Sequence, residues 1–223
     1  MIAFHLVFDL QMFGLVPYGT TLQPFFYWHA RGVAGSFLFL AGVSLWLAHG
    51  QGIRWPAFWR RWVRLAAAAA LVSGATYAAF PAYFVYFGIL HCIAACSLIG
   101  LLFLRLPALL TALGGAAVMA ASYVLPSDSF NAPLLRFLGL STLPAETLDF
   151  EPLLPWLGPF LLGLATGKIA SRMQLLTLLQ LPDTPVTRLL AWPGRHSLLI
   201  YLLHQPLLIG GLQAFIFLSV QFF

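Results

Sequence analysis

The sequence predicts an all-α membrane protein, a polytopic transmembrane helical bundle of about seven spans, and three observations lead to this fold class. Of the 223 residues 61% are hydrophobic and 8% are charged, and the mean hydropathy is +0.91. Soluble domains are about 25% charged, so 11 basic and 6 acidic side chains would not cover a water-exposed surface of this size. Apolar stretches long enough to cross a ~30 Å hydrocarbon core recur along the whole chain. None shows the alternation of barrel strands, so the spans are helices.

The expected spans follow one another with connections too short for a soluble domain, so residues 1–223 are predicted to form one multi-pass domain. The spans cover residues 1–16, 25–48, 65–82, 84–104, 108–125, 153–169 and 197–222. Between them, the fragments 134–140 and 173–181 are expected to lie along the membrane surface. The first span is short and lacks a basic flank. A short tilted helix and a missing N-terminal segment explain this equally well.

Charge asymmetry between the connections predicts the orientation. Basic residues, which favour the cytoplasmic side, are Arg54, Arg60, Arg61, Arg64, Arg105, Lys168, Arg172, Arg188 and Arg195. The 126–152 connection instead carries four acidic residues against Arg136. We therefore expect a multi-pass protein of the cell inner membrane with a cytoplasmic amino terminus. The sequence pI is about 9.6, but the basic residues lie between apolar runs, so membrane lipid and not nucleic acid is the expected partner.

Ionisable groups inside the spans are the best functional candidates, because such groups are costly at membrane depth unless they face a bundle interior or a cavity. His5 and Asp9 are four residues apart, which would let the carboxylate orient the imidazole as a general base. A purely structural polar pair is the alternative. His91 follows Gly88, where a ligand or another helix could approach, although a buried, hydrogen-bonded histidine explains it equally well.

Two further polar groups lie in the second and last spans. Near the outer end of the second span, Arg31 requires an anion or a carbonyl, either a structural partner such as Asp9 or a substrate, and His29 is either interfacial or functional. The last span carries a stripe at i, i+4 and i+7 with one adjoining residue. The stripe consists of Ser197, Tyr201, His204 and Gln205.

The residues Gly194, Arg195 and His196, immediately before the last span, predict an anion site. Free backbone N–H groups and cations at a helix start bind phosphates well, so these residues would suit a phosphorylated ligand from the cytoplasm. A helix cap with topology-setting charges explains the same residues. Cys92 and Cys96 lack CxxC spacing and are expected to be small packing residues, and no metal site is predicted.

Five sequence blocks stand in register over almost the whole chain. They are FHLVFDL (4–10), GSFLFLAGVSL (35–45), YFGILHCIA (86–94), EPLLPWLGPFLLG (151–163) and GRHSLLIYLLHQP (194–206). Together they resemble the bacterial membrane family related to the catalytic domain of heparan-α-glucosaminide N-acetyltransferase. The family's histidines match His5, His91, His196 and His204. A histidine implicated in the lysosomal enzyme lies nearest His29, whose surroundings WHARGVAGSF depart from that enzyme's pattern.

The resemblance implies a membrane acyltransferase that takes an acetyl or other acyl group from cytoplasmic acyl-CoA and gives it to a sugar or amine of the envelope. The family's opening Asp-x-x-Arg-Gly-x-Ala segment, ahead of a methionine like Met1, is absent, which favours a missing N-terminal segment. The chemistry needs a base and donors for an oxyanion. Candidate bases are His5 with Asp9, His91 and His204, and candidate substrate-binding residues are Arg31, His29, Tyr201 and Gln205.

Other functions also fit the composition. A small-molecule transporter or a non-catalytic membrane bundle would share these spans. Four histidines within spans would in principle ligate a b-type haem, but no pair on one helix has the depth relation of a two-haem cytochrome. The sequence leaves open the acceptor, the acyl chain and the oligomeric state, a homo-oligomer included.

Overall fold

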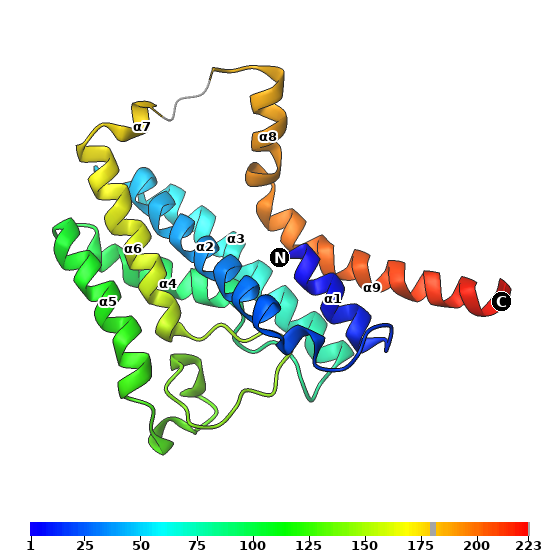
Figure 1. The fold of residues 1–223 in the computed structure, drawn as a ribbon. Helices are drawn as coiled ribbons and strands as arrows, with labels where there is room; N and C mark the ends of the chain where they lie inside the picture. Colours follow the sequence, from blue (N-terminus) through cyan, green and yellow to red (C-terminus); the bar gives the residue numbers. More distant parts are fainter. Residues whose placement is uncertain (179–181, 223) are drawn as a thin grey trace. The chain divides into compact units, whose positions relative to one another are not determined.

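The computed structural model describes residues 1–178 and 182–222, and all regular secondary structure in this part of the chain is helical (Figure 1). The helices are α1 (Ile2–Met12), α2 (Pro24–His49), α3 (Trp55–Ala79), α4 (Ile89–Phe103), α5 (Ala108–Val124), α6 (Leu153–Arg172), α7 (Leu175–Leu178), α8 (Pro185–Arg195) and α9 (Ser197–Phe222), with 3₁₀ turns η1 (Thr20–Leu22), η2 (Asp128–Phe130) and η3 (Arg136–Leu138). The all-α prediction is therefore confirmed. The chain divides into two compact units, one of residues 1–33 with the described residues from 182 onward, the other of residues 34–178.

Four of the described helices are long and apolar enough to cross a membrane. They are α2, α3, α6 and residues Ser197–Ser219 of α9. The helices α1, α4 and α5 are apolar but shorter. The protein is thus a helical membrane protein, while seven crossings and the cytoplasmic amino terminus stay predictions.

Two expected boundaries were wrong. The stretch rich in arginine and tryptophan, expected as a connection before residue 65, forms the first turns of α3, which begins at Trp55 with a proline in its first turn. Proline has the backbone angle of a helix start and needs no hydrogen bond there. The first helix ends at Met12, because Gly14 reverses the chain with φ 72°. The expected surface fragment 134–140 contains only η3, and fragment 173–181 contains α7, its residues 179–181 lying outside the described part.

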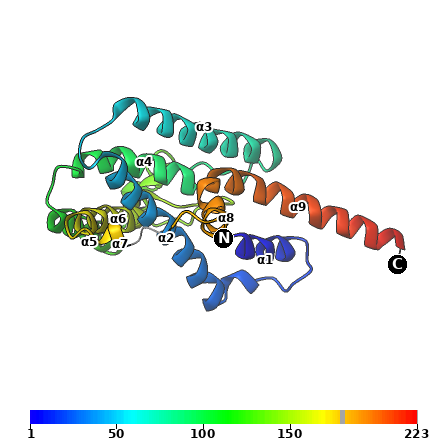
Figure 2. The same cartoon turned by 90° about the horizontal axis from the view of Figure 1, so that it is seen from above.

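The core of the 34–178 unit is built around α6. The helix α4 lies between α3 and α6, and α5 packs along α6 (Figure 2). Glycines bring α2 close to α6, since a Cβ at Gly42 would overlap the carbonyl of Phe160 and one at Gly163 would overlap that of Phe39. The thiols of Cys92 and Cys96 are free and fully buried, as expected for packing residues.

In the other unit, α1 lies alongside the first half of α9 (Figure 1). The loop after α1 folds back onto it, because the side-chain oxygen of Gln11 accepts hydrogen bonds from Thr21 N and Oγ1 at 3.1 and 3.2 Å. Both α1 and α9 are apolar on nearly every side. Among the few polar side chains they carry, Asp9 of α1 and Gln205 of α9 are hydrogen-bonded where the two helices meet.

Candidate active site

The contact between α1 and α9 brings together four side chains that the sequence predicted as site residues. We call His5, Asp9, His204 and Gln205 the α1–α9 cluster. The imidazole rings of His5 and His204 meet edge to face, with centroids 4.9 Å apart and planes at 60°. Asp9 and His204 are buried, and the other two side chains are half-buried.

Asp9 is held from α9. Its Oδ1 accepts a hydrogen bond of 2.7 Å from Gln205 Nε2, and the side chain is fully buried. An ionised carboxylate only accepts, so the amide must turn its NH₂ toward it. The expected His5–Asp9 pair is not formed, since Asp9 Oδ2 has no hydrogen-bond partner among the described residues. The spacing of four residues places the His5 and Asp9 side chains on one face of α1, but the Asp9 carboxylate accepts its hydrogen bond from the Gln205 amide on α9.

His204 is held in one tautomer. Its Nδ1 lies 2.5 Å from the carbonyl oxygen of Tyr201, one turn earlier on α9. A carbonyl oxygen cannot donate, so Nδ1 must carry a hydrogen. In the neutral ring the lone pair then lies on Nε2, which is buried and has no hydrogen-bond partner among the described residues. This is the protonation state that a general base requires.

Three buried atoms of the α1–α9 cluster have no hydrogen-bond partner in the described part of the chain: Asp9 Oδ2, His204 Nε2 and Gln205 Oε1. All three are acceptors. Buried polar atoms are normally paired, so unpaired ones point to a site for a water, an ion or a ligand. The missing group must donate hydrogen bonds, as a hydroxyl or an amine does. Gln205 Nε2 carries two hydrogens and gives one to Asp9, so its second N–H stays a candidate donor to an oxyanion.

The candidates of the second span lie differently. The His29 side chain is exposed and stacks on Phe25, with ring centroids 6.1 Å apart. The Arg31 side chain is also exposed, and its guanidinium lies 4.7 Å from the centre of the Tyr27 ring. Both side chains therefore lie at the surface of this unit, each beside an aromatic ring of its own helix.

His91 lies in the other unit, and both of its ring nitrogens are occupied. At the third position of α4, Nδ1 accepts a hydrogen bond from Gly88 N at 3.3 Å. Its Nε2 lies 3.2 Å from Ser73 Oγ, and that hydroxyl donates to Val85 O at 2.6 Å. These contacts cap the first turn of α4 and join it to α3. The structure thus favours the alternative reading of His91 as a satisfied structural histidine.

The predicted phosphate-binding turn before α9 has a different conformation. Gly194 and Arg195 lie in the last turn of α8, and the backbone N–H of His196 donates to Trp192 O at 3.1 Å. The His196 ring stacks on the indole of Trp192. Helix ends present carbonyl oxygens, so the expected cluster of free N–H groups at 194–196 was wrong.

Lys168 has a role that the sequence did not reveal. The position of this residue along the chain predicted a cytoplasmic charge. In the structure the side chain is buried, and its Nζ donates to the carbonyls of Phe103 and Leu106 and to Thr111 Oγ1 at 2.6 to 2.8 Å. It therefore closes the carboxyl end of α4. Its position inside an apolar run, directly after Gly167, is the available sequence signal. Among the described residues no three His, Cys, Asp or Glu side chains gather closely enough to hold a metal ion.

The described residues form an apolar helical fold with helices long enough to cross a membrane, which defines the class as a helical membrane protein. The particular family follows from comparison with known proteins. The family described as heparan-alpha-glucosaminide N-acetyltransferase, catalytic, matches residues 1–206 of the 223. The chain belongs to this family of membrane acyltransferases, which confirms the resemblance of the five blocks. No curated protein and no solved structure matches the chain significantly.

Proposed function

We propose that this protein transfers an acetyl or other acyl group from cytoplasmic acyl-CoA to a sugar or amine of the envelope on the far side of the inner membrane. Membership in an N-acetyltransferase family supports acyl transfer and acetyl-CoA as the donor. The observation that carries the proposal is the set of three unpaired acceptors in the α1–α9 cluster. A nucleophilic hydroxyl or amine supplies the donors that these atoms lack.

The roles follow from which atoms are open. The nucleophile donates its reactive hydrogen to His204 Nε2, and Asp9 Oδ2 or Gln205 Oε1 accepts a second donor and fixes the orientation. As the nucleophile attacks the thioester carbonyl, its proton passes to Nε2. A C–O or C–N bond forms, the C–S bond breaks, and the CoA thiolate takes that proton from the imidazolium.

The neighbours of His204 suit this proton transfer. The Nδ1–H bond to Tyr201 O fixes the ring so that Nε2 is the nitrogen that takes the proton. His5, whose ring lies against that of His204, is a positioning residue in this scheme and not the base. Within the α1–α9 cluster the second N–H of Gln205 Nε2 is the candidate donor to the oxyanion, because the three open atoms are acceptors.

The proposal is tested with His204→Ala. Membranes containing the protein are incubated with radiolabelled acetyl-CoA, and label in the envelope fraction is measured. Removal of a positioned base lowers the rate by ~10²–10⁴-fold, and free imidazole is expected to restore part of it. Ser219→Ala on the same helix is the matched control, because that hydroxyl bonds only to its own helix at Ile216 O. Undiminished labelling with His204→Ala, or substrate movement without consumption of acyl-CoA, would refute the proposal, the second result favouring a transporter.

A further inference from the structure

The two ends of the 34–178 unit carry opposite charge. All four of its acidic residues, Asp128, Glu146, Asp149 and Glu151, lie in the 126–152 connection, with Arg136 as the single cation there. The remaining cations lie in the first turns of α3, in the connections next to α2 and α5, and in the last two turns of α6. They are Arg54, Arg60, Arg61, Arg64, Arg105, Lys168 and Arg172. Contacts of Ser171 with Trp46 and of Lys168 with Leu106 hold these segments together at one end. That end attracts anions.

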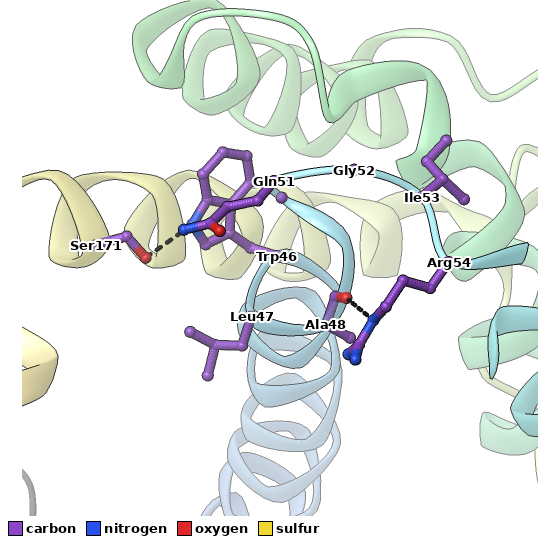
Figure 3. A pocket seen from close by; sticks show the side chains of 9 residues that line it. Trp46, Leu47, Ala48, Gln51, Gly52, Ile53, Arg54 and Ser171 are labelled. Atoms are coloured by element: carbon purple, nitrogen blue, oxygen red, sulfur yellow. Dashed lines mark hydrogen bonds between the residues drawn. The ribbon is translucent and has the colours of Figure 1, made fainter.

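A pocket of about 720 Å³ opens at this basic end (Figure 3). It lies between the carboxyl ends of α2 and α6 and the turn that leads into α3. Its lining combines the indole of Trp46, the aliphatic side chain of Ile53, the amide of Gln51 and the guanidinium of Arg54. Its lining contains no acidic side chain. Its volume is that of a site for a small organic ligand.

The wall of the pocket is fixed in place. Trp46 Nε1 donates to Ser171 Oγ at 2.8 Å, which ties α2 to α6. Glycines flank the indole on two sides, since a Cβ at Gly50 would come within 2.5 Å of the ring and one at Gly167 within 3.0 Å of the Trp46 side chain. A rigid aromatic wall lowers the entropic cost of binding a ligand.

Arg54 supplies the charge. Its Nε donates to Ala48 O at 3.1 Å, and Figure 3 shows the side chain turned back toward α2. The guanidinium makes no other hydrogen bond with the described residues, so its two terminal nitrogens remain for a ligand. Arginine with free terminal nitrogens matches the oxygen geometry of a phosphate.

We propose that this pocket binds the phosphate of a ligand, with Arg54 and Gln51 on the phosphate oxygens and Trp46 and Ile53 against the apolar remainder of the ligand. Two sources have this chemistry, the phosphates of CoA and the headgroup of an anionic phospholipid. Binding of CoA rests on the proposed function, because CoA is what remains of acyl-CoA after the acyl group has been transferred. The pocket also takes the phosphate-binding role that the sequence assigned to residues 194–196.

The test uses the full-length protein in nanodiscs of phosphatidylcholine, with CoA binding measured by calorimetry. Arg54→Gln is expected to raise the Kd for CoA about tenfold, as loss of one charge-assisted contact does. Arg64→Gln is the matched control, because Arg64 is an exposed arginine of α3 outside the pocket whose Nε donates to Arg60 O. Gln51→Ala, at an exposed turn residue, is the second variant and is expected to weaken CoA in the same direction.

A second arm distinguishes the lipid. In nanodiscs containing phosphatidylglycerol, lipid retained by the protein is counted by native mass spectrometry. Loss of bound phosphatidylglycerol in Arg54→Gln, with an unchanged Kd for CoA, assigns the phosphate site to the lipid. Unchanged binding of both, or equal losses in Arg54→Gln and Arg64→Gln, overturns the pocket proposal even where acetyl transfer is intact. If the protein binds CoA or phosphatidylglycerol in this pocket but transfers no label from acetyl-CoA to the envelope, the proposed function is overturned and the pocket proposal stands.

Discussion

Replacing Asp9 by asparagine changes one open atom of the α1–α9 cluster and little else. The amide keeps its oxygen toward Gln205 Nε2, because its own NH₂ would otherwise face another NH₂. The nitrogen then takes the place of Oδ2, which is an unpaired acceptor among the described residues of the wild-type chain. A donor now meets the donor of the nucleophile. The substitution is nearly isosteric, so the contact of α1 with α9 is preserved.

The magnitude follows from the lost interaction. A hydrogen bond to a charged group contributes about 1.5–3 kcal/mol, so kcat/KM should fall roughly 10- to 150-fold at 1.36 kcal/mol per tenfold. Stability should not fall, since a fully buried carboxylate with one hydrogen bond is itself costly.

The assay measures the initial rate of label transfer from radiolabelled acetyl-CoA, and thermal unfolding in detergent monitors the fold. Asp183→Asn is the matched control, because this carboxylate is exposed and paired with Arg188 at 2.8 Å. Wild-type kcat/KM in Asp9→Asn would refute the acceptor role. A loss of rate that merely tracks a lowered unfolding temperature would refute it as well.

Two predictions concern the 34–178 unit. Lys168→Met removes three charge-assisted hydrogen bonds, to the carbonyls of Phe103 and Leu106 and to the buried Thr111 hydroxyl, so stability should fall by about 3 kcal/mol or more, visible as a lower unfolding temperature. An unchanged unfolding temperature would contradict the capping role. Gly163→Ala forces a Cβ onto Phe39 O and should cost about 1–3 kcal/mol, whereas Gly74→Ala, with nothing within 4 Å of its Cβ, should be neutral or slightly stabilising. Similar unfolding temperatures for the two alanine variants would contradict the close approach of α2 and α6.

The sequence could predict which helices carry polar groups but not how those groups pair. Hydropathy alone placed a described helix in every expected span, and the stripe on α9 correctly located His204 and Gln205 at a helix contact. Spacing along one helix fixes a face and not a partner. Asp9 could reach His5 on its own helix or an amide on another, and only the approach of α9 decided between them.

The contacts of charges at helix ends could not be predicted for a related reason. Lys168 was counted with the cytoplasmic charges, because the positive-inside rule uses only the position of a charge along the chain. Its long side chain reaches the end of α4, more than 60 residues away in sequence, where carbonyls lack helical partners. The same rule could not separate a solvated arginine from Arg54, which lines a pocket.

Two of the histidines expected as candidate bases, His91 and His204, differ in a way that their place in a helix explains. In the first turn of a helix the backbone N–H groups are unpaired, so a histidine at the third position accepts one on Nδ1, as His91 does from Gly88. Its proton is then on Nε2 in the neutral ring, directed at Ser73. In the middle of a helix every N–H is used, and a neighbouring side chain meets only carbonyls. His204 therefore holds its proton on Nδ1 toward Tyr201 O and keeps the Nε2 lone pair for a ligand. Position within the helix thus decides which of two similar apolar helices can carry a base.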